Sequence, residues 1–187
     1  VDSLFDIYDE GLSTGIFEDG SEDGASLVRV IEGEEAEAIW DIYEKPFEGL
    51  GENDPTLAGF DRESLEDILK DPEIVKVINR VAGEITTLMI FLHDFDKAPW
   101  FNKSAYQEKY PDYFDSENIF IFPGIVSDEN KRGNNYAMDV IDLATKVAAK
   151  RDSSLLITFE CTELSTTYIP EIVENALEHS GVAKVSG

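Results

Sequence analysis

A polar turn between two apolar segments carries the clearest chemical signal in this chain of 187 residues. The segment 119–126 is typical of a strand, and the segment 136–148 repeats apolar residues at helical spacing. Between them stand Lys131 and Arg132, followed by Gly133-Asn134-Asn135. A strand that leads into a helix in this way places main-chain N–H groups at the helix N-terminus, where an anion such as a phosphate can bind. We therefore predict an anion site at this turn.

The chain is strongly acidic, with 40 acidic and 15 basic residues and a formal net charge of −25. This excess argues against a general affinity for nucleic acid, whose backbone needs Lys and Arg. Three interpretations of the acidity stay open: a solvated surface, steering of a cationic substrate such as an amine, and imitation of nucleic acid by an acidic interaction surface. A basic pair at a turn is unexpected in such a chain unless an anion binds there.

The single cysteine, Cys161, excludes an internal disulfide and fits a reducing compartment. No stretch reaches the ~18 apolar residues of a membrane span, and the first residues show no charged-then-apolar pattern of a signal peptide. We therefore expect a cytoplasmic protein that does not bind membranes. The first residue, Val1, leaves open that the sequence is a processed form or an excerpt. No Cys/His spacing resembles a zinc site, and Asp94-Phe95-Asp96 lacks the rest of an EF-hand loop, so we expect no metal.

The length favours one domain over 26–187, preceded by an acidic, weakly ordered segment over 1–25. We predict strands at 26–31, 74–81, 85–92, 119–126 and 155–159, and helices at 34–44, 61–69, 136–148 and 169–177. Pro46 should end or kink the first helix, and Gly83-Glu84 should join two strands as a hairpin. This order predicts an α/β (α+β) fold with a mixed central sheet and helices on both faces.

The same order resembles the fold of the GNAT superfamily of N-acetyltransferases. That family opens its central helix with an Arg/Gln-x-x-Gly-x-Gly/Ala turn, and Arg132-Gly133-Asn134-Asn135-Tyr136-Ala137 occupies this frame here. The resemblance spans roughly residues 27–182. It implies an acyl-CoA-dependent N-acyltransferase that transfers acetyl from acetyl-CoA to a small-molecule or peptide amine by direct attack in a ternary complex.

The resemblance also implies a binding role for each matching position. The backbone of Ile125 and Val126 would pair with the pantetheine arm, and an N–H near Val126 would stabilise the oxyanion. The residues implied around the pyrophosphate are Lys131, Arg132, Gly133, Asn134, Asn135 and Ala137. Acyl transfer to an amine also needs a base and a route for protons.

Glu160 is our first candidate for the base, because it follows the strand at 155–159. The family's general-acid Tyr has Leu177 at its position here, so Tyr168 is the nearest substitute. The alternative interpretations are an exposed acid at a strand end and a packed aromatic side chain. Further acids near the ends of strands are Asp94, Asp96, Glu117 and Glu163.

Several departures from the family pattern support a second hypothesis. Asn135 replaces the central glycine of the turn, Leu177 replaces the Tyr, and the chain stops soon after Gly181. The alternative is therefore a catalytically silent GNAT-like domain that binds a protein partner, or a homodimer whose partner supplies the sheet edge. We expect the aromatic connection at 93–118 to recognise the acceptor, while the acceptor and the acyl chain length stay unspecified.

Overall fold

The computed structural model describes residues 23–47, 60–97, 102–131, 135–151 and 156–159, together with Asn175 and Glu178. Its elements in chain order are β1 (Gly24–Val28), α2 (Glu34–Phe47), α4 (Arg62–Lys70), β2 (Val75–Val81), β3 (Glu84–Leu92), η3 (Phe95–Lys97), α5 (Lys103–Lys109), α6 (Pro111–Asp115), β4 (Ile119–Ser127), η4 (Glu129–Lys131), α7 (Tyr136–Arg151) and β5 (Leu156–Phe159). This order confirms the succession of long elements predicted from the sequence.

The five strands form one mixed sheet with the order β1-β2-β3-β4-β5. The first three pairs of neighbours are antiparallel, and β4 and β5 are parallel. The predicted hairpin between β2 and β3 is confirmed. Its two turn residues, Ala82 and Gly83, have φ values of 54° and 78°. Two positive φ angles in succession are typical of the type I′ turn, whose twist matches that of the strands it joins.

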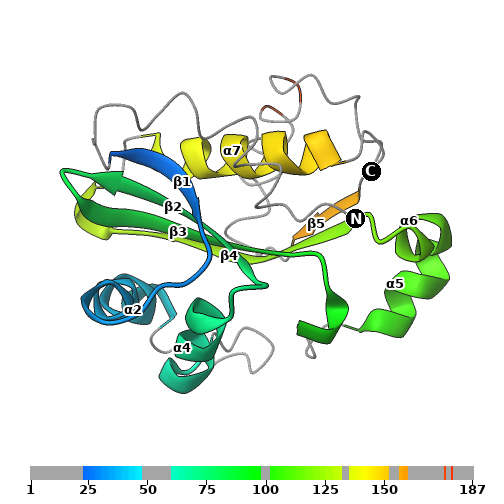
Figure 1. Cartoon of the computed structure of the whole chain (residues 1–187), viewed down its shortest axis with the longest axis horizontal. Coiled ribbons are helices and arrows are strands. Elements are labelled where there is room, and N and C mark those ends of the chain that lie inside the picture. Colours follow the sequence, from blue (N-terminus) through cyan, green and yellow to red (C-terminus); the bar gives the residue numbers. More distant parts are fainter. Residues whose placement is uncertain are drawn as a thin grey trace.

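Helices cover both faces of the sheet, as the sequence predicted. Figure 1 shows α7 on one face and α2 with α4 on the other. The α7 face is packed with apolar side chains that include Val77, Met89 and Phe120. The opposite face is packed with a second set that includes Ile78, Leu88 and Ile121. Because apolar residues of β1, β2, β3 and β4 alternate between these two sets, this part of the sheet is buried on both sides.

Local sequence explains where the helices begin and end. Asp61 caps α4, with its Oδ1 accepting a hydrogen bond from the Ser64 N–H at 2.8 Å, as its position before an apolar run predicted. The helix α2 ends at Phe47, one residue beyond Pro46. The helix α7 buries Val140, Ala144 and Val147 at helical spacing, which confirms its predicted apolar face.

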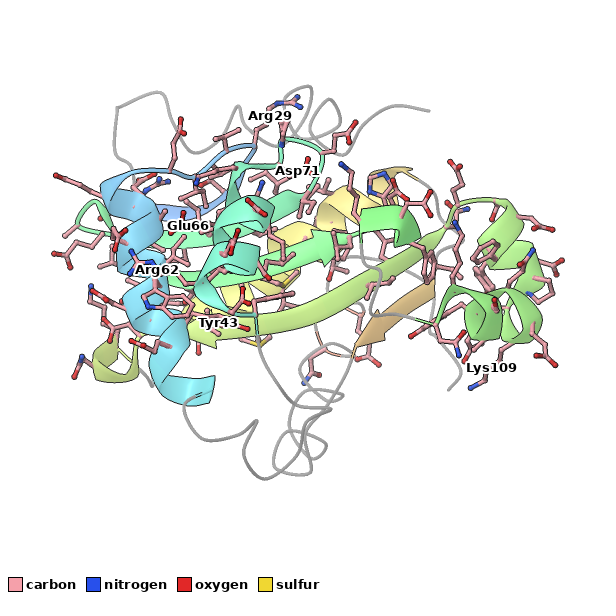
Figure 2. The ribbon with its side chains drawn as sticks, turned by 90° about the horizontal axis from the view of Figure 1, so that it is seen from below. Arg29, Tyr43, Arg62, Glu66, Asp71 and Lys109 are labelled. Carbon is pink, nitrogen blue, oxygen red and sulfur yellow. The ribbon has the colours of Figure 1, made fainter. Side chains whose placement is uncertain are left out.

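The aromatic connection at 93–118 folds locally into η3, α5 and α6. These elements lie at the end of the sheet where β3 ends and β4 begins, away from α2 (Figures 1 and 2). The Phe95 ring packs on Tyr106 and Phe114, with ring centroids 5.2 and 5.4 Å apart. Aromatic packing therefore orders this connection.

Two predicted features lie outside the described residues: most of the segment 1–25 and nearly all of the last helix at 169–177. The described Asn175 and Glu178 are helical. The division of the chain at residue 25 stays a prediction, and β1 already begins at Gly24.

Candidate functional site

The turn after β4 is anchored to the neighbouring strand by Asp128. Its N–H donates to the Thr86 carbonyl at 2.9 Å, which continues the contact between β4 and β3. Its carboxylate accepts a hydrogen bond from the Asn130 N–H at 2.9 Å, and its carbonyl accepts one from the Lys131 N–H at 3.0 Å. These contacts form the short helix η4 and fix the direction in which the chain leaves the strand.

The helix α7 then begins at the end of the same turn. The Asn135 carbonyl accepts a hydrogen bond from the Asp139 N–H at 3.0 Å, so Asn135 occupies the N-terminal boundary of the helix. The first N–H groups of an α-helix have no partner inside the helix, and they carry about half a positive charge together. Ala137 lies in this first turn. The structure thus brings Asn135 and Ala137 to a helix N-terminus, as the sequence predicted.

Two charged side chains modify this junction. Lys131 forms an ion pair with Glu84 at 2.9 Å, and this contact raises the pKa of the Lys131 ammonium above its ordinary value. Asp139 is an acid in the first turn of α7, and burial together with the charge of Asp142 raises its pKa. Glu84 therefore already balances part of the positive charge of Lys131. An anion at this junction would depend more on main-chain N–H groups than on the lysine.

On the other side of the junction, the described pairing of β4 with β5 is short. The parallel pairing runs only from Ile119 opposite Leu156 to Phe122 opposite Phe159. The antiparallel pairing of β4 with β3 continues to Ser127. Among the described strands, none pairs with the outer edge of β4 over residues 124–127. We call this segment the open edge of β4.

A β-bulge interrupts the pairing of β4 with β3. Leu92 pairs with Ile121 and Ile90 pairs with Gly124, so two residues of β4 lie opposite the single residue Phe91. The second of these two residues is Pro123, which has no N–H to donate to a strand ladder. The described pairing with β5 runs up to the residue before it. The sequence Pro123-Gly124 therefore coincides with the bulge in β4.

The described structure leaves space on the face of β4 at Gly124. A Cβ added to Gly124 would meet no atom of the described structure within 4 Å. The next two side chains pack into opposite layers, Ile125 against the α7 face and Val126 against the α2 face. This alternation fixes the strand while its backbone edge points along the plane of the sheet.

The predicted binding residues fall into two groups. Five of them are described, and the open edge, the turn and the helix start bring them into one continuous stretch: Ile125, Val126, Lys131, Asn135 and Ala137. The others lie outside the described residues: Arg132, Gly133, Asn134 and both catalytic candidates, Glu160 and Tyr168. The roles of all ten stay predictions.

Other acids that the sequence suggested lie elsewhere. Asp94 and Glu117 line a cavity at the start of β4, the opposite end of the strand from the turn. Asp96 forms an ion pair with Lys103 at 2.7 Å. Sequence reasoning did not find this cavity or the bulge, although a Pro-Gly pair inside a strand is a signal for a bulge.

Within the described residues, no group of three or more His, Cys, Asp or Glu side chains is arranged to hold a metal ion. No helix in the described part of the chain is long and apolar enough to cross a membrane.

No protein-family model matches the chain, and no curated protein matches it. Solved structures do. An aminoglycoside acetyltransferase from an uncultured soil metagenomic sample, in complex with sisomicin, matches with a TM-score of 0.50 and 11% identity over 87% of this chain and 91% of its own. A GNAT-family acetyltransferase from Bacillus anthracis matches with a TM-score of 0.50 and 14% identity over 88% of this chain and 82% of its own. A ribosomal-protein-alanine N-acetyltransferase from Brucella melitensis biovar Abortus 2308 matches with a TM-score of 0.49 and 16% identity over 87% of this chain and 91% of its own.

The two matches with a TM-score of 0.50 define the class of fold, a mixed sheet between helices. This is the fold of the GNAT acetyltransferases, which confirms the fold that the resemblance implied. At such low identities the matches establish the fold alone.

Proposed function

We propose that this chain is a divergent GNAT enzyme, an acyl-CoA-dependent N-acyltransferase that transfers an acyl group, acetyl in the first instance, to an amine. The observation that carries the proposal is the open edge of β4. On a GNAT fold, this edge, with which no described strand pairs, comes shortly before the N-terminus of α7 in the chain.

The two parts of this stretch suit the two parts of coenzyme A. The pantetheine arm contains amide groups, and an extended chain with amides can pair with an exposed strand edge as an added strand does. The pyrophosphate is an anion, and the N-terminus of α7 offers N–H groups and a favourable dipole. The bulge at Pro123 and the empty Cβ position at Gly124 support space for the arm at this part of β4.

The charges at the junction refine the assignment. Because Glu84 already pairs with Lys131 and Asp139 lies in the first turn of α7, side-chain charge favours an anion there less than the sequence alone suggested. We therefore assign most of the pyrophosphate binding to main-chain N–H groups of the turn and of α7, with Arg132 as the principal cation.

The chemistry follows from aminolysis of a thioester. The neutral amine of the acceptor attacks the thioester carbonyl carbon, a C–N bond forms, the C–S bond breaks, and the departing thiolate takes up a proton. A main-chain N–H near Val126 would stabilise the oxyanion. Glu160 is our candidate for the base that accepts the proton of the amine, and Tyr168 is our candidate for the acid that protonates the thiolate.

Calorimetric titration with coenzyme A and acetyl-CoA tests the proposal. In a separate thermal-unfolding measurement, a ligand at a hundredfold excess over its dissociation constant should raise the free energy of unfolding by about 2.7 kcal/mol. The variant Arg132→Ala should bind roughly tenfold more weakly, because it loses a charge-assisted contact with phosphate. The control is Arg151→Ala, which removes an arginine from the opposite end of α7 and should leave the affinity unchanged.

The outcomes separate the hypotheses. Binding of acetyl-CoA with acetylation of an amine supports the enzyme. Binding without transfer to any amine of a broad panel contradicts catalysis and favours the silent interaction domain. A folded protein that binds neither coenzyme A nor acetyl-CoA contradicts the proposal altogether.

A further inference from the structure

A second candidate site lies at the start of β4, where the connection 93–118 folds against the sheet. It is a cavity of about 290 Å³. Its lining residues are His93, Asp94, Phe95, Lys103, Tyr113, Phe114, Glu117 and Ile119. We call it the β4-start cavity.

The apolar wall of this cavity is held in place by packing. The Phe95 ring is buried and packs on Phe114 with centroids 5.4 Å apart. The Tyr113 carbonyl accepts a hydrogen bond from the N–H of buried Asn118 at 2.9 Å, which ties α6 to the first residues of β4. Glu117, between them, has φ of 56°, a left-handed conformation that is uncommon for residues other than glycine and is found preferentially at functional sites.

The charged residues of the described lining carry more negative than positive charge. Asp94 and Glu117 contribute two carboxylates, and among the described lining residues Lys103 is the one lysine or arginine. The Lys103 ammonium is already paired with Asp96 at 2.7 Å. A ligand that enters the cavity therefore meets an excess of negative charge beside three aromatic rings, an environment that favours a cation.

We propose that the β4-start cavity binds an organic ammonium group. Carboxylates can accept hydrogen bonds from the ammonium, and the faces of aromatic rings attract it. A volume of about 290 Å³ lies at the low end for small-molecule sites, so the cavity suits the end group of a ligand better than a large molecule.

The position of the cavity on β4 suggests what this end group belongs to. Ile119 lines the cavity, and the bulge at Pro123 lies four residues further on, about 13 Å along the strand. If the proposed function holds, the cavity anchors the far cationic end of the acceptor while the reacting amine lies at the open edge. The preferred acceptor class is then a long diamine or polyamine.

Binding of small probes to the full chain, without coenzyme A, tests the site itself. The probes are butylamine, which is protonated at pH 7, its neutral analogue butanol, and the anion butyrate, each followed by amide chemical shifts. We expect butylamine to shift the amides of Asp94, Phe95, Tyr113 and Glu117 at lower concentration than either other probe.

Paired variants separate the cavity from the general acidity of the chain. Asp94→Asn with Glu117→Gln should weaken butylamine binding roughly tenfold. Asparagine retains an oxygen for the hydrogen bond that Asp94 Oδ1 accepts from the Asp96 N–H at 2.9 Å, so the fold should be kept. The control is Glu108→Gln with Asp115→Asn, which removes two exposed acids from the same connection but outside the cavity lining and should leave binding unchanged.

Three results would overturn the site: equal binding of butanol, preferential binding of butyrate, or equal weakening by both double variants.

The role as an acceptor anchor is tested by acetylation of diaminodecane against decylamine. A higher kcat/KM for the diamine, lost in the cavity double variant, supports the role, and equal values contradict it. Failure of coenzyme A binding would contradict the proposed function. The cavity proposal would still be tested by butylamine binding, which does not depend on coenzyme A.

Discussion

The β2–β3 hairpin and the β4–β5 pair show two opposite uses of strand pairing in one sheet. The hairpin pairs along all of β2, from Val75 to Val81, and closes in a two-residue turn. The described β4–β5 pairing extends over four residues, up to Phe122. The first arrangement satisfies its backbone groups internally. In the second, the outer edge of β4 over residues 124–127 has no partner among the described strands, so stability and ligand binding are expected to depend on different residues.

The hairpin also contains an unusual buried cation. Lys76 on β2 is fully buried, and its Nζ donates hydrogen bonds to the carbonyls of Arg29, at 2.7 Å, and of Asp71. Asp71 ends α4 as its C-cap and forms an ion pair with Lys97 at 2.7 Å. The lysine therefore connects the end of β1 to the end of α4, on the face that Figure 2 views.

The largest effect should come from the core beneath the hairpin. Ile78→Ala removes a fully buried side chain and should lower the free energy of unfolding by about 3 kcal/mol, measured by urea denaturation. Ile78→Val is the matched control and should cost about 1 kcal/mol. Both variants should bind coenzyme A with unchanged affinity while folded. A large change in affinity would show that the two regions are not independent.

The next effect is a dependence of stability on pH. Burial lowers the pKa of Lys76 to about 8 from 10.5, although the charge of Asp71 opposes this shift. Between these two pH values the unfolded chain binds more protons than the folded chain, so this lysine makes stability rise with pH. The full shift corresponds to about 3 kcal/mol.

The variant Lys76→Met isolates this effect from all other titrating groups. The unfolding free energy of the natural chain should rise relative to that of the variant as the pH increases from 7 to 10. A constant difference between the two chains over this range would contradict the assignment.

Sequence patterns predicted the hairpin well, because alternating apolar residues and the turn at Gly83 are local signals. They also predicted α4, whose cap Asp61 is adjacent to the helix it starts. The open edge of β4 could not be predicted in the same way. It depends on where β5 stops pairing, which is a contact between residues far apart in the sequence. The ion pair of Lys131 with Glu84 is likewise non-local, so the sequence overstated the positive charge of the turn.

A smaller effect is expected at the open edge itself. Gly124 has an ordinary φ angle, and no described atom lies within 4 Å of the position of its absent Cβ. Gly124→Leu should therefore change stability little, yet it should fill the space beside the edge and weaken coenzyme A binding about tenfold, which is about 1.4 kcal/mol.

Gly124→Ala at the same position is the graded control and should bind nearly as the natural chain does. Calorimetry on the three chains measures the series. Equal affinity of all three would place the pantetheine arm elsewhere.

The smallest effect concerns a hydrogen bond between Tyr43 of α2 and Phe60. The Phe60 N–H donates to the Tyr43 hydroxyl at 2.7 Å, and burial raises the pKa of this phenol to about 12. Tyr43→Phe should lower the unfolding free energy by about 1 kcal/mol at pH 7. Tyr110→Phe, in the connection beyond β3, serves as the control. A loss as large as that of Ile78→Ala would contradict the ranking of these contacts.

Amide chemical shifts of the isotope-labelled chain during titration with coenzyme A test the central claim most directly. The account predicts the largest saturable shifts at the amides of residues 124–127 and 135–137, with little change along the β2–β3 hairpin. Saturable shifts confined to other residues, or no shifts at millimolar coenzyme A in a folded chain, would contradict it.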